Sequence, residues 1–438
     1  MKKVALHNLG CKVNAYETEA VQQMLEECGY EIVPFHEYAD VYIINTCSVT
    51  NMADRKSRQM LHRAKKQNPD AVVVAMGCYV QTAAEEVKND TAVDIVIGNN
   101  KKHELPGLLR KYEEEKANGE TELAVIDINE KGQPYEELFL KKTAEHTRAF
   151  IKVQDGCNQF CSYCIIPYAR GRVRSRKTED VLREVEHLAE QGYKEVVLTG
   201  IHLSSFGVDT GDTLLHLIEE VHKVEGIERI RLGSLEPRIV TEEFAKKLAG
   251  MPKICPHFHL SLQSGCDVTL KRMNRRYDTE EYANKCEILR KYFKHPAITT
   301  DVIVGFPGET EEEFETTREF LENVHFYEMH IFKYSKRKGT KAAVMADQVP
   351  EDIKTKRSGR LLELEKEMSE EFREFYLGRT KEVLLEEEME LDGTRYFTGY
   401  TKEYVKVAVR ADGHAANTMV RGRMERKLSD GLYLMVEF

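Results

Sequence analysis

The chain lacks the features that would place it in or beyond a membrane. Its 438 residues contain no apolar run that approaches the ~20 residues needed to span a bilayer. The first residues, MKKVALHNLGCKVN, carry two lysines, but His7 and Asn8 interrupt the apolar stretch that a secretory signal requires. We therefore expect a cytoplasmic protein with no membrane partner.

The chain also lacks an excess of positive charge, a repeat and a low-complexity tract. It has 64 lysines and arginines against 74 aspartates and glutamates, a formal net charge of −10. A nucleic-acid partner would have to be bound by local basic patches, against an unfavourable overall field. Because 438 residues are too many for one ordinary core, we expect two or three domains.

The N-terminal part alternates short apolar segments with amphipathic ones. Val- and Ile-rich segments at 3–9, 41–45, 71–76 and 94–98 predict buried parallel strands separated by helices. This pattern is typical of a doubly wound α/β domain, which we place at residues 1–114. A charged segment with Gly and Pro near its end follows, and we interpret residues 115–142 as a linker.

The alternation then resumes over a longer stretch. Strands are predicted at 149–153, 195–200, 229–234, 258–262, 297–306 and 327–334, with helices near 178–191, 213–224, 241–250, 279–292 and 310–324. This order indicates a full or partial parallel β/α barrel at residues 143–375. Short β-type runs with Asp-Gly and Gly turns predict a small all-β module of OB-like size at 376–438.

Three cysteines without a fourth follow the first predicted barrel strand. Cys157, Cys161 and Cys164 form a C-x3-C-x2-C run, at the edge where parallel strands place an active site. Structural zinc needs four ligands, and no thioredoxin pattern surrounds the run. Three thiolates on a four-iron cluster leave one iron open for a ligand. The alternative is a chance cluster of three packed thiols.

Three further cysteines occupy equivalent places in the N-terminal domain. Cys11, Cys47 and Cys78 each lie shortly after a predicted parallel strand. Because such positions converge in one crevice, they indicate a second cluster with an unligated iron. The alternative is that these thiols are packed as small hydrophobic side chains.

Several motifs together carry a family resemblance. NLGCKVN, INTCSVT, GCYVQ, GCNQFCSYCIIPYARG, LSLQSG and DVIVGFPGET resemble the radical S-adenosylmethionine (SAM) methylthiotransferase family over nearly the whole chain. That family joins an N-terminal methylthiotransferase domain, a radical-SAM barrel and a C-terminal RNA-binding TRAM module. LGCKVN with NTCSVT is most similar to the branch acting on N6-threonylcarbamoyladenosine at position 37 of tRNA. The isopentenyladenosine branch typically has YGCQMN, and the ribosomal-protein branch has LGCPKN.

The resemblance implies cofactors, partners and catalytic residues. Cys157, Cys161 and Cys164 would hold the SAM-cleaving [4Fe–4S] cluster, and the other trio a second [4Fe–4S] cluster that carries or relays sulfur. One SAM would give a 5′-deoxyadenosyl radical and another the methyl group, forming 2-methylthio-N6-threonylcarbamoyladenosine. The implied partners are a tRNA anticodon loop carrying the modified adenosine 37, a flavodoxin- or ferredoxin-like low-potential electron donor and a sulfur source.

Polar and aromatic residues at the barrel mouth are candidates for binding SAM. We expect contributions from Tyr163, Gly200, Ser261, Gln263 and Asp301. The polar ones are equally compatible with ordinary hydrogen bonding at a barrel mouth. Where many members of the superfamily have Gly-Gly-Glu, this chain has Thr-Gly-Ile at 199–201. Backbone contact at Gly200 is still compatible with SAM, but the carboxylate is missing.

Three basic runs follow predicted barrel strands and predict a phosphate-binding collar at the mouth. The runs comprise Arg170, Arg172, Arg174, Arg176 and Lys177; Lys271, Arg272, Arg275 and Arg276; and Lys333, Lys336, Arg337, Lys338 and Lys341. In the C-terminal module, Tyr396, Phe397, Tyr400 and Tyr404 are either base-stacking or core residues. The rival function from another class is a two-cluster electron carrier, and methylthiolation of isopentenyladenosine 37 is the rival within the enzymes.

Overall fold

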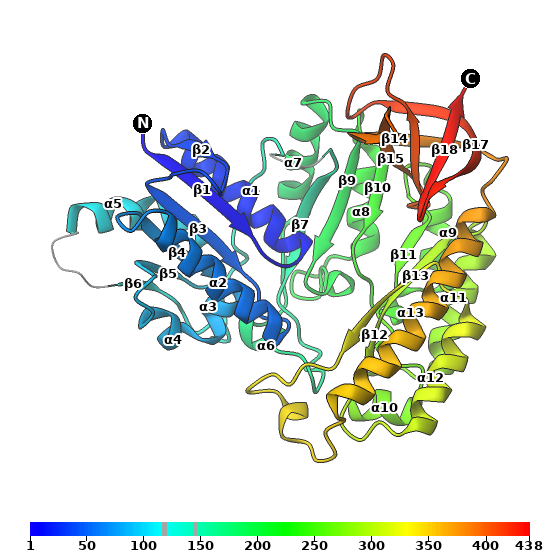
Figure 1. Ribbon diagram of the computed structural model, residues 1–438, viewed down its shortest axis with the longest axis horizontal. Helices are drawn as coiled ribbons and strands as arrows, with labels where there is room; N and C mark the ends of the chain where they lie inside the picture. The colour runs from blue at the N-terminus through cyan, green and yellow to red at the C-terminus, as the bar shows by residue number, and fades with distance from the viewer. Residues whose placement is uncertain (116–120, 144–146) are drawn as a thin grey trace.

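The computed structural model describes residues 1–115, 121–143 and 147–438. Residues 116–120 of the predicted linker and residues 144–146 at the start of the predicted barrel domain lie outside the described part. Three bodies are visible: an N-terminal α/β domain, a central set of parallel strands and a small C-terminal barrel (Figure 1). Among the described residues, no helix combines the length and the apolar character needed to cross a membrane.

The N-terminal domain is a doubly wound sheet, as predicted. Its six parallel strands have the order β2-β1-β3-β4-β5-β6. They are β1 (Lys3–Asn8), β2 (Glu31–Val33), β3 (Val41–Thr46), β4 (Val72–Gly77), β5 (Ile95–Ile97) and β6 (Glu122–Ala124). The helices are α1 (Lys12–Glu27), α2 (Asn51–Gln67), α3 (Cys78–Thr82), α4 (Ala84–Lys88) and α5 (Leu105–Glu115). Each face of the sheet has its own hydrophobic core. Helices α1 and α5 pack on one face, and helices α2, α3 and α4 pack on the other.

The predicted linker contributes to this domain. β6 lies within it and pairs with β5 through the register Ile95–Glu122. Leu138 and Leu140 are buried, and Tyr16 of α1 donates a hydrogen bond of 2.7 Å to the carbonyl of Leu138. The described part of the segment is therefore packed against both flanking domains.

The central domain is a partial parallel barrel, and all six predicted strands are present. These are β7 (Ala149–Asp155), β9 (Glu195–Gly200), β10 (Arg229–Leu232), β11 (His257–His259), β12 (Ala297–Val304) and β13 (Glu328–Lys333). Single bridges, Ile230–Ile254 and Leu235–Leu260, join β10 to the β11-β12-β13 sheet. A short strand, β8 (Arg174–Ser175), runs antiparallel to β7. In the described chain β8 and β13 do not pair, so the barrel is open there.

Helices cover the outer face of the barrel strands. They are α7 (Thr178–Glu190), α8 (Leu214–Lys223), α9 (Glu242–Ala249), α11 (Thr279–Tyr292), α12 (Glu311–Val324) and α13 (Glu351–Glu374), with short turns of helix at α6 (Ile166–Ala169) and α10 (Asp267–Arg272). Ile151 and Leu198 pack in the core beneath them. Because side chains alternate along a strand, the neighbouring residues Lys152 and Val197 belong to the inner face.

The first helix covers the part of that inner face formed by β7 and β9. Tyr16 and Ala20 of α1 pack against Phe150 of β7 and Val197 of β9. Figure 1 shows the N-terminal domain beside these strands. On the β13 side the inner face is more open, since Phe332 is 46% exposed.

The C-terminal module is a closed five-stranded barrel. Its strands are β14 (Thr380–Leu391), β15 (Thr394–Thr401), β16 (Lys406–Arg410), β17 (Met419–Ser429) and β18 (Leu432–Glu437). Arg229 donates a 2.8 Å hydrogen bond to the carbonyl of Tyr400, and Tyr404 stacks on His257 with ring centroids 4.7 Å apart. Arg229 and His257 begin their strands, so the module covers the N-terminal ends of the barrel (Figure 1).

This docking decides between the two interpretations of the C-terminal aromatic residues. The rings of Tyr400 and Tyr404 stack on each other, and Arg148 lies over both. Tyr396 is 7% exposed within the module's own core. These tyrosines are packing residues, and Phe397 also packs against the module's core.

Candidate active site

Three cysteines meet at the carboxyl edge of the N-terminal sheet. Strands β1, β3 and β4 are neighbours, and Cys11, Cys47 and Cys78 follow them directly. Gly10, at φ +112°, is so close to Cys47 that a Cβ there would lie 3.0 Å from the thiol sulfur. The parallel arrangement therefore brings together three thiols that are far apart in the sequence.

Cys78 is the most enclosed member of this trio. It is 4% exposed, and the guanidinium Nε of Arg170 donates to its Sγ over 3.2 Å. The side-chain amide of Asn99 also approaches the same sulfur, at 3.7 Å. These two contacts fix the position of the sulfur at the interface between the two domains.

The second trio lies on the loop that follows β7. Gly156, at φ +71°, begins the loop, and a Cβ there would lie 1.8 Å from the carbonyl of Arg172. The Cys157 amide donates to the carbonyl of Gly171 at 3.0 Å, closing the loop on itself. The Ser162 hydroxyl donates to the carbonyl of Arg272 at 2.8 Å, which anchors the loop to the region after β11.

Arg275 connects this trio with the barrel mouth. One of its terminal nitrogens donates to Cys161 Sγ at 3.2 Å, and the other donates to the carbonyl of Ser261 at 3.2 Å. Burial raises the pKa of Cys157 to about 11 and that of Cys164 to about 12. At neutral pH these thiols are therefore protonated until a metal displaces the protons. Three thiols on one loop, one buried and two partly exposed, lie beside a fixed cation and form a donor set that fits an iron–sulfur cluster.

Two family models match the chain. Residues 151–321 match the Radical SAM superfamily, and residues 3–98 match the family described as uncharacterized protein family UPF0004. A threonylcarbamoyladenosine tRNA methylthiotransferase of Bacillus subtilis is 45% identical, covering 94% of this chain and 91% of the relative. A protein of the same name from Aquifex aeolicus is 42% identical, covering 92% and 98% respectively.

The chain belongs to the radical SAM methylthiotransferase family. A tRNA-2-methylthio-N(6)-dimethylallyladenosine synthase of Acetivibrio thermocellus is also related, at 38% identity over 97% of this chain and 88% of the relative. The structure of a radical SAM methyltransferase from Kitasatospora setae superposes with a TM-score of 0.59 at 17% identity, covering 78% of this chain and 77% of that one, and shows the same fold.

Family membership implies two iron–sulfur clusters, for which the two cysteine trios are the candidate ligands. A radical SAM methylthiotransferase uses SAM and two [4Fe–4S] clusters. The clusters would be held by Cys157, Cys161 and Cys164 after β7, and by Cys11, Cys47 and Cys78 at the N-terminal sheet. Both trios lie at carboxyl ends of parallel strands, where such folds place their ligands.

The predicted SAM-binding residues lie around the cysteine loop in different settings. Tyr163 packs edge-on against Phe306, with ring centroids 6.4 Å apart. A Cβ on Gly200 would lie 2.9 Å from the Gln154 side chain. Gln263 has a left-handed backbone conformation, with φ at +78°, and its backbone N–H donates a hydrogen bond to the carbonyl of Asp301. Their contact with SAM stays a prediction.

The first basic run is largely structural, contrary to the predicted collar. Arg170, Arg174 and Arg176 are at most 4% exposed. Arg170 binds Glu17 of α1, and Arg176 binds Glu184 of α7. In the sequence, this run of arginines looks like an exposed basic surface, because the acidic residues that pair with them lie outside the run.

Arg170 belongs to a balanced buried network of charges. Lys152 Nζ lies 2.8 Å from a Glu17 oxygen and 2.6 Å from an Asp155 oxygen. Lys102 approaches Glu17 at 3.2 Å. These groups join α1 to β7 and to the cysteine loop. A lysine inside the apolar segment AFIKV was the sequence signal for such a network, because a buried charge needs a partner.

The other two runs also contribute structural anchors. Arg337 lies 2.7 Å from Asp54 of α2 and donates to the Ser48 hydroxyl at 2.8 Å, holding the N-terminal domain to the loop after β13. Arg272 pairs with Glu313. The exposed basic residues of the three runs are Arg172, Lys177, Lys271, Arg276, Lys333, Lys336, Lys338 and Lys341.

Proposed function

We propose that this protein converts N6-threonylcarbamoyladenosine at position 37 of tRNA to its 2-methylthio derivative by radical SAM chemistry. The observation that carries the proposal is the gathering of six cysteines into two trios at the carboxyl ends of two parallel sheets that share an interface. Relatives at 45% and 42% identity bear the corresponding name over nearly their full length. An electron carrier would have no use for a barrel with an open inner face.

The target bond explains why radical chemistry is needed. An aromatic C–H of adenine is neither acidic nor electrophilic enough for ordinary acid–base catalysis. When bound, the clusters and SAM supply hydrogen abstraction and the methylthio group. The chain's own task is to position these groups and the base, and to exclude water from them.

The protein's residues perform the positioning through fixed contacts. Arg275 holds the loop of Cys161 against the carbonyl of Ser261. Gln154 donates through its amide to the carbonyl of Gly156 at 2.7 Å and accepts from the backbone of His202 at 2.7 Å. The cysteine loop is therefore braced on both sides before any ligand binds. Tyr163, Gly200, Ser261 and Gln263 are the proposed SAM neighbours, whereas the carboxylate of Asp301, the remaining candidate, pairs with His259 instead.

The partners follow from the same proposal. An anticodon loop suits the site because its bases can be splayed out at modest energetic cost. The exposed basic residues Arg172, Lys177, Lys271 and Arg276 flank the cysteine loop and would contact phosphates. A low-potential flavodoxin- or ferredoxin-like protein would supply electrons, and a separate sulfur source would renew the transferred atom.

The names of the relatives favour the threonylcarbamoyl substrate over dimethylallyladenosine, since those at 45% and 42% identity are named for the first and one at 38% identity for the second. The threonyl group ends in a carboxylate, whereas the dimethylallyl group is a hydrocarbon. A cationic side chain beside the bound base would therefore distinguish the two substrates.

The test is a paired anaerobic assay. Reconstituted protein, SAM, sulfide and a reductant are incubated with tRNA that carries either threonylcarbamoyladenosine or dimethylallyladenosine at position 37, and nucleosides are quantified by mass spectrometry. We expect the methylthio product from the first tRNA only. Product from the dimethylallyl tRNA alone would establish the second substrate instead. The variant Cys157→Ala, Cys161→Ala, Cys164→Ala is the control and should give no product.

A further inference from the structure

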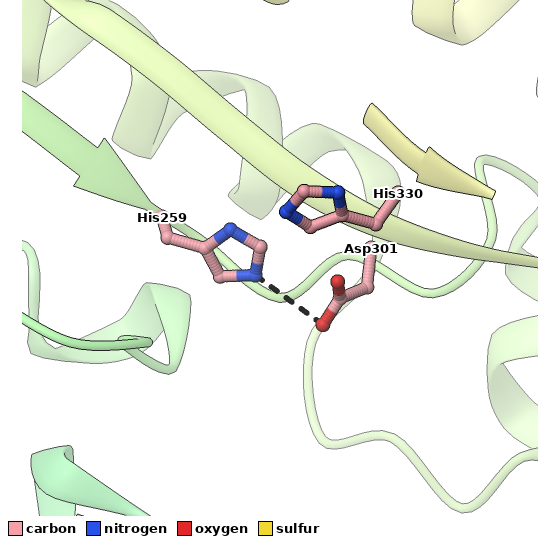
Figure 2. Close-up of side chains that lie close together, drawn as sticks. All are labelled: His259, Asp301 and His330. Carbon is pink, nitrogen blue, oxygen red and sulfur yellow. Dashed lines mark ion pairs between the residues drawn. The ribbon is translucent and has the colours of Figure 1, made fainter. Parts of the chain in front are cut away.

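A group of metal-ligating side chains on the inner face of the barrel belongs to neither cysteine trio. His259, Asp301 and His330 come from the neighbouring strands β11, β12 and β13 and point toward one another (Figure 2). One donor atom from each lies within 4.8 Å of the other two. The strand register pairs Asp301 with His330 and places His259 opposite Thr299, so all three belong to the same face of the sheet.

The two ring nitrogens of His259 face different groups, Nδ1 the hydroxyl of Thr299 and Nε2 the carboxylate of Asp301. Its Nδ1 lies 3.0 Å from the hydroxyl of Thr299, within hydrogen-bond distance. Its Nε2 lies 3.3 Å from an Asp301 oxygen, yet this buried nitrogen has no hydrogen-bond partner among the described residues. With Nδ1 beside the Thr299 hydroxyl, Nε2 is the ring nitrogen that faces the carboxylate. Metal-ligating histidines are oriented in this way.

The surroundings combine enclosure with access. The His259 side chain is 12% exposed and that of Asp301 is 27% exposed, whereas His330 is an exposed residue. The imidazoles of His259 and His330 lie nearly parallel, with ring centroids 5.7 Å apart. Two of the three donors are thus held by the fold, and the third is free to adjust.

We propose that His259, Asp301 and His330 bind a divalent transition-metal ion with open coordination positions on the inner face of the barrel. Two imidazole nitrogens and one carboxylate form the donor set of open Fe²⁺, Mn²⁺ and Zn²⁺ sites. Ligands at ~2.1 Å from a metal are about 3.4 Å apart, so His259 and Asp301, at 3.3 Å, already have the spacing of two ligands, and His330 closes the site by a small side-chain movement. The site does not depend on the proposed tRNA substrate.

One nearby charge sets the expected strength of binding. Lys12 lies within electrostatic range of His330 and opposes a cation there. We therefore expect binding weaker than that of a structural zinc site. Manganese is a suitable probe, because Mn²⁺ prefers nitrogen and oxygen donors to the thiolates of the cysteine trios.

The experiment is a Mn²⁺ titration of the cluster-loaded protein, followed by electron paramagnetic resonance with the clusters in their diamagnetic oxidised state. The signal of free Mn²⁺ decreases as the ion binds, and its loss should correspond to one Mn²⁺ bound per chain. The variants Asp301→Asn and His330→Ala should each weaken Mn²⁺ binding at least ~10-fold. An unchanged iron content shows that these variants are folded. The matched control is His62→Ala, which removes a surface histidine 3.0 Å from Asp90 and should bind Mn²⁺ normally.

Three results would overturn the proposal. The first is wild-type protein that leaves Mn²⁺ free up to millimolar concentrations. The second is binding that is equal in wild type, Asp301→Asn and His330→Ala, because the ion would then occupy another place. Equal weakening by the His62 control would assign the signal to surface histidine–carboxylate pairs and would also overturn it.

Discussion

The guanidinium Nε of Arg170 lies 3.2 Å from the Sγ of Cys78, so the loop carrying one cysteine trio touches the other trio directly. The terminal nitrogens of the same arginine bind Glu17 and Asn14, both on α1. Arg170 is fully buried, and its loop is closed by the bond from Cys157 to Gly171. The two trios are therefore held in one frame that spans the domain interface.

Replacing Arg170 with methionine should destabilise the protein strongly. The change removes a positive charge that pairs with the buried carboxylates of Glu17 and Asp155. Breaking a buried ion pair costs about 3–5 kcal/mol. Urea unfolding of the metal-free chain measures this loss. The double variant Arg170→Met, Glu17→Gln should recover part of the stability, since it removes the uncompensated carboxylate. Equal stability of wild type and Arg170→Met would contradict the assigned network.

Gly156 should tolerate no side chain. A Cβ there would lie 1.8 Å from the carbonyl of Arg172, and the backbone is left-handed at φ +71°. Gly156→Ala should distort the cysteine loop and reduce bound iron from about eight to about four per chain. Gly192→Ala is the control for strain alone, because its φ is +89° but no described atom lies within 4 Å of the added carbon. It should cost about 1 kcal/mol and leave the iron content unchanged.

His202 should make stability depend on pH in the acid range. Burial lowers its pKa to about 4 in the folded protein, whereas the unfolded chain has the ordinary value of 6.5. As the pH falls below 6.5, the unfolded state binds a proton that the folded state does not, so stability is lost down to pH 4, by about 3 kcal/mol.

The variant His202→Asn isolates this effect. An amide can replace the contact of Nδ1 with the Ser205 hydroxyl, which is 2.6 Å long, without titrating. The unfolding free energies of wild type and variant are measured on the metal-free chain at pH 7 and at pH 4. Between pH 7 and pH 4 the wild type should lose about 3 kcal/mol more stability than the variant. A difference that is independent of pH would contradict the lowered pKa.

Arg229 should couple the C-terminal module to the barrel. It is fully buried and donates at 2.8 Å to the carbonyls of Tyr400 and Glu382. Arg229→Ala leaves these carbonyls unpaired, at a cost of about 1–3 kcal/mol each. The expected result is faster proteolysis between residues 374 and 380, which join α13 to β14. Lys402→Ala, which removes a surface contact with Pro252, should have little effect. Unchanged proteolysis of the Arg229 variant would show that the arginine does not hold the module.

The sequence predicts what depends on local patterns and on the rules of parallel sheets. β-branched runs located the strands, and each cysteine followed a strand end, so the convergence of Cys11, Cys47 and Cys78 could be inferred without coordinates. The three-residue strands β2 and β6 were missed because an edge strand of that length carries almost no pattern.

The interior charges of the site could not be predicted in the same way. Arg170 and Glu17 are 153 residues apart in the sequence, and only the docking of α1 on the inner face brings them together. The group of His259, Asp301 and His330 likewise depends on the register of three strands. Each of these residues alone is an ordinary polar residue at a barrel mouth.

The most direct test of the account is anaerobic measurement of iron and sulfide in the reconstituted protein and two triple variants. One variant replaces Cys157, Cys161 and Cys164 with alanine, and the other replaces Cys11, Cys47 and Cys78. Wild type should bind about eight irons and each variant about four. If the second variant keeps the full iron content, the N-terminal trio is ordinary packing, and methylthio transfer by a two-cluster site is contradicted.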